Sequence, residues 1–131
     1  MLRIRERLVD EVMILDVTGA LRSGGAVALG GTIEALAGSG HRRMLVNLAR
    51  ASNADMSGIN ALLGGLLTAR RNGGDVKLLH MTQRMQIPVI VALHGYFAVF
   101  DSERDALESF GLELPASRAD RAARLSNVAA A

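Results

Sequence analysis

The chain has 131 residues, of which 50% are hydrophobic and 21% are charged, a balance that excludes a mainly disordered chain and suits one hydrophobic core. The absence of cysteine excludes a disulfide framework, a thiolate metal site and a cysteine nucleophile. The net charge of +2 belongs to the arginine-bearing segment after Pro115, so the rest of the chain has no basic excess and direct binding of nucleic acid is not expected.

The first element that the sequence predicts is a β-hairpin. Apolar residues alternate with arginines over residues 2–8, which is the period-two pattern of a strand with one solvated face. Asp10 and Glu11 supply a turn, and residues 12–17 follow as a second, more buried strand. The charged alternation lacks the apolar core of a signal peptide, and no apolar run in the chain reaches the length of a membrane span. We therefore expect a cytoplasmic protein.

The next predicted elements are a helix and a central strand. Residues 19–25 contain three glycines and are expected to form a loop, in which Ser23 is a candidate N-cap for a helix over residues 26–37. The glycines of residues 38–40 end that helix. Residues 42–49 form a short apolar run without alternation, as is typical of a strand that is covered on both faces.

The rest of the chain continues the alternation of helices and strands. A helix is predicted within SNADMSGINALLGGLLTARRNGG, residues 52–74, where arginines and glycines mark its C-terminus. The later elements are a strand over 75–80, a helical segment over 82–94 that Pro88 either starts or breaks, a strand over 96–100, and a helix from Ser102 to Phe110 with Asp105 at the capping-box position. The order β-β-α-β-α-β-α-β-α predicts one α/β domain with right-handed crossovers, largely parallel after the hairpin. Residues 113–131, rich in Ala and Arg, are expected to form a peripheral helix or to be disordered.

Little in the sequence points to catalysis. The three histidines lie far apart, which argues against a metal site. No glycine-rich nucleotide fingerprint occurs, and Lys77 is the only lysine, so there is no Walker lysine. No G-x-S-x-G elbow surrounds a serine. We therefore expect a protein without enzymatic activity, metal or cofactor.

The helix within residues 52–74 has two unlike faces. One stripe carries the leucines and isoleucine of a buried face: Ile59, Leu62, Leu63, Leu66 and Leu67. The opposite face is small and almost uncharged: Asn60, Ala61, Gly64, Gly65, Thr68 and Asn72. Each glycine costs about 1 kcal/mol relative to alanine in a helix interior, so a compensating close contact is expected. That contact is either with the rest of the fold or with a docked partner.

The start of the same helix contains Asp55 and Ser57, whose side chains can both satisfy free backbone N–H groups. Ser57 is either a helix cap or a phosphorylation site. A phosphate there would add about 1.5 to 2 negative charges beside the small face, and the helix N-terminus would tolerate that anion. A partner lying on the small face would then be repelled.

The segment MLVNLARASNADMSGINALLGGLLTARRNGGDVKLLH resembles the core of STAS domains, in particular the bacterial anti-sigma factor antagonists. The resemblance covers about residues 2–110 and includes the D-x-S-G motif of Asp55 to Gly58. It implies one STAS domain over residues 1–112, with a mixed, mostly parallel sheet of four to five strands after an N-terminal hairpin and four to five helices. One departure is Asn47, which stands where many members have Asp.

The resemblance also implies a partner-switching function. Ser57 would be phosphorylated by an anti-sigma factor that is a serine kinase, and a PP2C-type phosphatase would reset the switch. Asp55 would hold the local geometry or orient the hydroxyl, and Gly58 would let the kinase approach and the helix begin. The partner would bind the surface formed by Met56, Asn60, Ala61, Gly64, Gly65 and Thr68.

Other functions remain open at this stage. The protein could instead be a non-catalytic STAS scaffold subunit of a stress-signalling or lipid-transport assembly, or it could bind a second copy of itself. A third alternative is a small module that binds a nucleotide, which the resemblance suggests for relatives. A monomer modified on Ser57 would favour the switch, whereas a stable large assembly would favour the scaffold.

Overall fold

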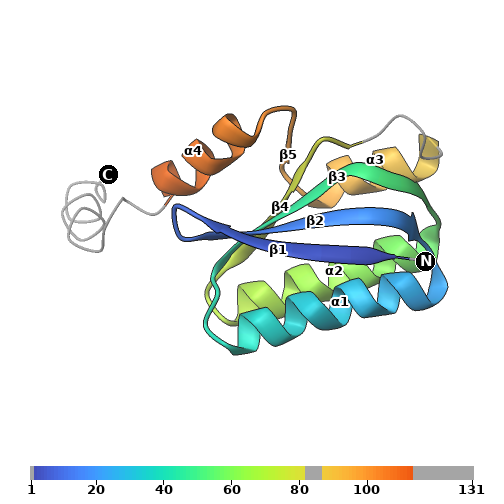
Figure 1. Ribbon diagram of the computed structural model, residues 1–131, viewed down its shortest axis with the longest axis horizontal. Coiled ribbons are helices and arrows are strands. Elements are labelled where there is room, and N and C mark those ends of the chain that lie inside the picture. Colours follow the sequence, from blue (N-terminus) through green and yellow to red (C-terminus); the bar gives the residue numbers. More distant parts are fainter. Residues whose placement is uncertain (1, 82–86, 114–131) are drawn as a thin grey trace.

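The computed structural model describes residues 2–81 and 87–113. Within these residues the chain forms one sheet of strand order β1-β2-β3-β4-β5 together with four helices (Figure 1). The elements are β1 (Arg3–Val9), β2 (Val12–Leu21), α1 (Ser23–Gly38), β3 (Arg43–Ala54), α2 (Met56–Arg71), β4 (Asp75–Leu79), α3 (Ile87–Tyr96), β5 (Val99–Phe100) and α4 (Glu103–Glu113). The predicted α/β fold and order of elements are confirmed, whereas the predictions for residues 82–86 and 114–131 lie outside the described residues.

The sheet begins with the predicted hairpin. β1 pairs with β2 in antiparallel fashion, and each of the later strand pairs is parallel. Asp10 and Glu11 at the turn have φ angles of 50° and 66°, as a type I′ hairpin turn requires at its two central residues. The turn therefore suits the right-handed twist of the two strands that it joins.

β2 and β3 are longer than predicted. The loop expected over residues 19–25 is wrong, because β2 continues to Leu21 and pairs there with Ala54 at the end of β3. β3 carries two irregularities, and at each of them it has one residue more than β2 between paired positions. Such bulges break the regular side-chain alternation, so the polar sequence of this part of β3 did not read as a strand. Ser23 is not the N-cap of α1, because that position belongs to Arg22.

Helices cover both faces of the sheet, but to different extents. α1, α2 and α3 pack on one face, where they share the larger hydrophobic core with residues of β2, β3 and β4. α4 lies across the opposite face near the hairpin end (Figure 1). It buries Phe110 and Ala106 against Ile14, Leu45 and Leu79. β3 is therefore covered on both faces along its first half, as predicted.

The C-terminal elements follow local rules. Pro88 lies in the first turn of α3, where a missing N–H costs no intrahelical hydrogen bond. Ser102 precedes α4 and its hydroxyl accepts a hydrogen bond from the Asp105 N–H at 3.0 Å, which confirms the predicted cap. Within the described residues no helix is both long enough and apolar enough to cross a membrane.

Candidate functional site

The start of α2 is capped by Asp55 and not by Ser57. Asp55 has extended backbone angles at the N-cap, and its Oδ1 accepts a hydrogen bond from the Gly58 N–H at 3.2 Å. Ser57 lies in the first turn of the helix and is exposed. Among the described residues its hydroxyl makes no hydrogen bond. The Ser57 oxygen is therefore accessible from solvent, and it lies beside the positive end of the helix dipole.

Gly58 is needed by the fold itself. It is buried, and a Cβ at this position would collide with the backbone carbonyl oxygen of Leu21 and lie 3.1 Å from the Leu21 Cγ. Leu21 is fully buried at the end of β2. The resemblance implied that Gly58 lets a kinase approach and the helix begin, and that role stays a prediction. The structure shows that Gly58 also permits the close packing of α2 on β2.

A weak ion pair links the starts of the two long helices. The Arg22 Nε lies 4.0 Å from Asp55 Oδ2, and both side chains are about half exposed. Exposed ion pairs contribute little to stability, so its main effect is on local charge. It places a guanidinium close to the carboxylate that caps α2, and this partly offsets the negative charge near Ser57.

The small face of α2 is partly occupied by α1, which corrects one prediction. Gly65 is buried, and a Cβ there would lie 2.8 Å from Cγ2 and 3.0 Å from Cβ of Ile33. A Cβ on Gly30 of α1 would likewise lie 3.1 Å from the backbone oxygen of Ala61. Gly65 therefore serves helix–helix packing within the fold, so it is not available to a partner.

The exposed part of α2 is narrower than the sequence indicated. Leu67, expected in the core, is 46% exposed, because the helix turns its other side toward α1 and the sheet. Ala61, Gly64 and Thr68 are partly buried. The exposed residues of the first turns are Met56, Ser57 and Asn60, and the partly buried Gly64 continues their stripe. We call these four residues the Ser57 surface.

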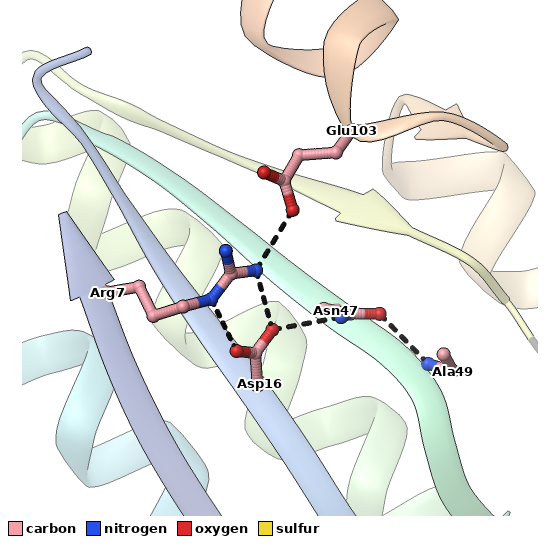
Figure 2. Close-up of polar contacts among 5 residues, drawn as sticks. All are labelled: Arg7, Asp16, Asn47, Ala49 and Glu103. Carbon is pink, nitrogen blue, oxygen red and sulfur yellow. Dashed lines mark hydrogen bonds and ion pairs between the residues drawn. The ribbon is translucent and has the colours of Figure 1, made fainter. Parts of the chain in front are cut away.

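A polar network that the sequence did not reveal lies on the face of the sheet opposite α1 and α2 (Figure 2). Arg7 of β1 donates hydrogen bonds to both carboxylate oxygens of Asp16 on β2 and also to Glu103 of α4 at 2.9 Å. Asn47 donates to Asp16 at 2.9 Å and accepts from the Ala49 N–H at 3.1 Å. Asn47 thereby satisfies a backbone donor at the first bulge of β3. No spacing in the sequence joins these residues, because they come from four different elements.

The network shifts the pKa values of its charged members. Burial alone would raise the pKa of Asp16, but the hydrogen bonds from Arg7 and Asn47, with the charge of Arg7, outweigh it and leave the pKa below its ordinary value. The hydrogen bonds to Asp16 and then to Glu103 raise the pKa of Arg7. Both groups therefore stay charged at neutral pH.

Lys77, the only lysine, is buried beneath α4. Its Nζ donates to the Ser109 hydroxyl at 2.8 Å and lies 4.4 Å from the centre of the Phe110 ring. Burial lowers its pKa, and the charge of Asp75 opposes that change. The contacts tie α4 to β4, so we interpret Lys77 as a packing residue. Within the described residues no three His, Asp or Glu side chains come together as metal ligands would.

Comparison with known proteins gives a family and a set of similar folds. A family model described as "Mlab, STAS domain" matches residues 4–94. The protein tm1081 of Thermotoga maritima is 17% identical, with a TM-score of 0.72 over 81% of this chain and 92% of that one. Comparison with curated proteins finds no match.

Two further solved structures are similar. The anti-sigma factor antagonist SpoIIAA of Bacillus, in its unphosphorylated form, is 18% identical, with a TM-score of 0.67 over 82% of this chain and 97% of that one. SpoIIAA has also been solved in its phosphorylated form, with a TM-score of 0.62. A serine-to-glutamate variant of RsbS from Moorella thermoacetica is 14% identical, with a TM-score of 0.65 over 84% and 98% of the two chains. At these identities the likeness establishes a shared fold.

Proposed function

The chain belongs to the STAS domain family, and from this premise we propose that it is an anti-sigma factor antagonist that works by partner switching. In its unmodified form it binds an anti-sigma factor serine kinase through the Ser57 surface. The kinase transfers a phosphoryl group from ATP to the Ser57 oxygen, which releases ADP and a proton, and the complex dissociates. A PP2C-type phosphatase hydrolyses the phosphate and restores binding.

The observation that carries this proposal is the exposed Ser57 hydroxyl, which takes no part in capping its helix. A serine that capped α2 would be held by the backbone, and its modification would loosen the helix. Here Asp55 caps the helix, so a phosphate on Ser57 would leave that hydrogen bond in place. The existence of SpoIIAA structures in phosphorylated and unphosphorylated forms supports a modification that the shared fold can accommodate.

The physical basis of the switch is a change of charge on an otherwise neutral surface. Met56, Asn60 and Gly64 carry no charge, whereas phosphoserine adds about 1.5 to 2 negative charges beside them. The free amides and dipole at the start of α2 would stabilise the phosphate within this protein. A partner bound to the same surface would lose contacts, because the phosphate group is bulky and negatively charged. Binding would therefore change strongly while the fold changes little.

The test measures binding to anti-sigma factor serine kinases from the same genome by titration calorimetry. Ser57→Ala is expected to keep binding, because the hydroxyl supports no structural contact. Ser57→Asp is expected to bind about tenfold more weakly or worse, since an unpaired charge enters the interface. Ser39→Asp is the control variant. Ser39 is exposed at the C-terminal end of α1, so this substitution adds the same charge far from the start of α2. A folded Ser57→Asp protein that binds as tightly as the wild type contradicts the proposal.

A second candidate function is that of a scaffold subunit in a larger STAS assembly. It is favoured by exposed apolar side chains on two helices, with Ile87 and Val91 of α3 exposed to 74% and 64% and Val27 of α1 to 71%. Such side chains commonly mark subunit contacts when they cluster. Light scattering on protein purified from its own cells separates the two functions. A monomer, or a complex with one kinase, fits the switch, and a stable large assembly with unmodified Ser57 fits the scaffold.

A further inference from the structure

α4 covers only the hairpin end of its face of the sheet, and no described helix covers the far end of that face. There, β1, β2 and β3 line a groove of about 620 Å³, a volume within the range of small-molecule sites. The arginines Arg3, Arg5 and Arg50 contribute to its walls, together with Thr18, Asp16 and Asn47. The groove lies on the sheet face opposite α1 and α2, so it is separate from the packing surface of those helices.

Strand register explains why these side chains gather. Arg3 pairs with Thr18, which in turn pairs with Arg50, so these three form one row across the strands. Arg5, Asp16 and Asn47 form the next row on the same face. The first bulge of β3 places Arg50 opposite Thr18; without the extra residue that place would belong to Ala49. The irregularity thus adds an arginine to the groove.

The charges within the groove do not balance. Asp16 is the only carboxylate among the described residues that line the groove, and both of its oxygens already accept hydrogen bonds from Arg7. Among the ion pairs of the described residues none involves Arg3, Arg5 or Arg50. The groove therefore combines a concave shape with three guanidinium groups, none of which forms an ion pair within the described residues, although the charge of Arg5 acts on Asp16.

The dimensions suit a small anion with more than one charged group. Neighbouring strands lie about 4.8 Å apart, so the backbones of Arg3 and Arg50 are about 10 Å apart on either side of Thr18. Arg3 and Arg5 are about 7 Å apart along β1. Guanidinium groups bind phosphate and carboxylate through paired hydrogen bonds, and arginine side chains can converge across such distances. Among the described lining residues no hydroxyl is hydrogen-bonded to a base, so the arrangement of arginines is that of a binding site.

We propose that this groove binds a small phosphorylated molecule with at least two neighbouring anionic groups, held by Arg3, Arg5 and Arg50. The ligand bridges the two rows of side chains and neutralises the excess positive charge. Arg50 lies on β3, the strand that leads into the cap of α2, so an occupied groove contacts the strand that positions the Ser57 surface. The proposal stands on the groove alone and does not depend on phosphorylation of Ser57.

The experiment uses the full chain and inorganic tripolyphosphate as the probe, followed by titration calorimetry and by NMR shifts of backbone amides. Binding is expected, with shifts concentrated on β1 and on β3 around Arg50. Arg5→Gln and Arg50→Gln are each expected to weaken tripolyphosphate binding about tenfold, because each removes one charge-assisted hydrogen-bonded pair between arginine and phosphate. Arg71→Gln is the control, because it removes the same charge from an exposed position at the end of α2.

A second arm distinguishes a soluble ligand from a lipid headgroup. Sedimentation with phosphatidylglycerol vesicles, against phosphatidylcholine vesicles, measures membrane binding of the same four proteins. If only the vesicles bind, and the two groove variants reduce that binding, the site recognises headgroup phosphates. If tripolyphosphate alone shows this pattern, the ligand is soluble. Absence of binding to either probe, or an equal loss in the Arg71→Gln control, overturns the proposal.

Discussion

Gly64 and Gly65 are neighbours in α2, yet alanine at the two positions is expected to change stability in opposite directions. A Cβ on Gly64 would meet nothing closer than Glu34 Oε2 at 3.9 Å, an ordinary contact. Gly64→Ala therefore gains helix propensity without crowding and should stabilise the protein by about 0.5–1 kcal/mol. The same propensity gain applies to Gly65→Ala, so the difference between the two variants isolates packing.

The packing cost at Gly65 follows from its contact with Ile33. The new methyl group would lie 2.8 Å from Cγ2 and 3.0 Å from Cβ of that residue, which is fully buried in α1. Because the Ile33 Cβ is fixed to its backbone, relief requires α1 and α2 to move apart. Overpacking costs about 1–3 kcal/mol, so after the propensity gain Gly65→Ala should lose up to about 2 kcal/mol.

Guanidinium unfolding followed by circular dichroism measures both effects. With equal m values, the midpoint should rise for Gly64→Ala and fall for Gly65→Ala, and the two free energies of unfolding should differ by the packing cost of about 1–3 kcal/mol. The wild-type protein is the common reference. Equal stabilisation by both alanines would refute the tight contact between α1 and α2, and would return Gly65 to the exposed face.

Three further predictions concern the cap, the close approach and the polar network. Asp55→Ala should destabilise the protein by about 1 kcal/mol through loss of the N-cap, whereas Ser57→Ala should change stability by less than about 0.5 kcal/mol, as chemical unfolding would measure. Gly58→Ala should cost about 2–3 kcal/mol in the same assay, because its methyl group meets backbone at the end of β2. Asp16→Asn should cost about 1–3 kcal/mol at pH 7 by weakening the pairing with Arg7. Because the pKa of Asp16 is lowered on folding, this stabilisation is fully present above its ordinary value of 3.8 and is lost as pH falls through the folded value.

Each of these predictions has a contrary result. A larger loss for Ser57→Ala than for Asp55→Ala would make Ser57 the cap and weaken the case for a free hydroxyl. Unchanged stability of Gly58→Ala would mean that α2 does not approach β2 as closely as described. For Asp16→Asn, a deficit that stays constant from pH 7 to pH 2 would show that the pairing with Arg7 does not stabilise the fold.

The sequence predicted those parts of the fold that depend on local pattern. Alternation identified the hairpin, an unbroken apolar run identified the central part of β3, and Ser102 identified the start of α4. The patterns failed where pairing between distant strands decides the structure. Residues Gly19 to Leu21 form a strand only because the bulged end of β3 lies beside them.

The candidate site was predicted in part for the same reason. The D-x-S-G motif located Ser57 and Asp55, but spacing alone could not say which of them caps the helix. The packing roles of Gly58 and Gly65 depend on Leu21 and Ile33, which are distant in sequence. The arginine groove was invisible because its rows exist only once the register of three strands is fixed.

Intact-mass measurement with site mapping, on protein purified from its own cells during growth and during stress, tests the central claim most directly. The account predicts a phosphate on Ser57 whose occupancy differs between the two conditions, on a protein that remains folded. A chain that carries no phosphate on Ser57 in either condition contradicts the switch, and the Ser57 surface would then be understood as an assembly contact.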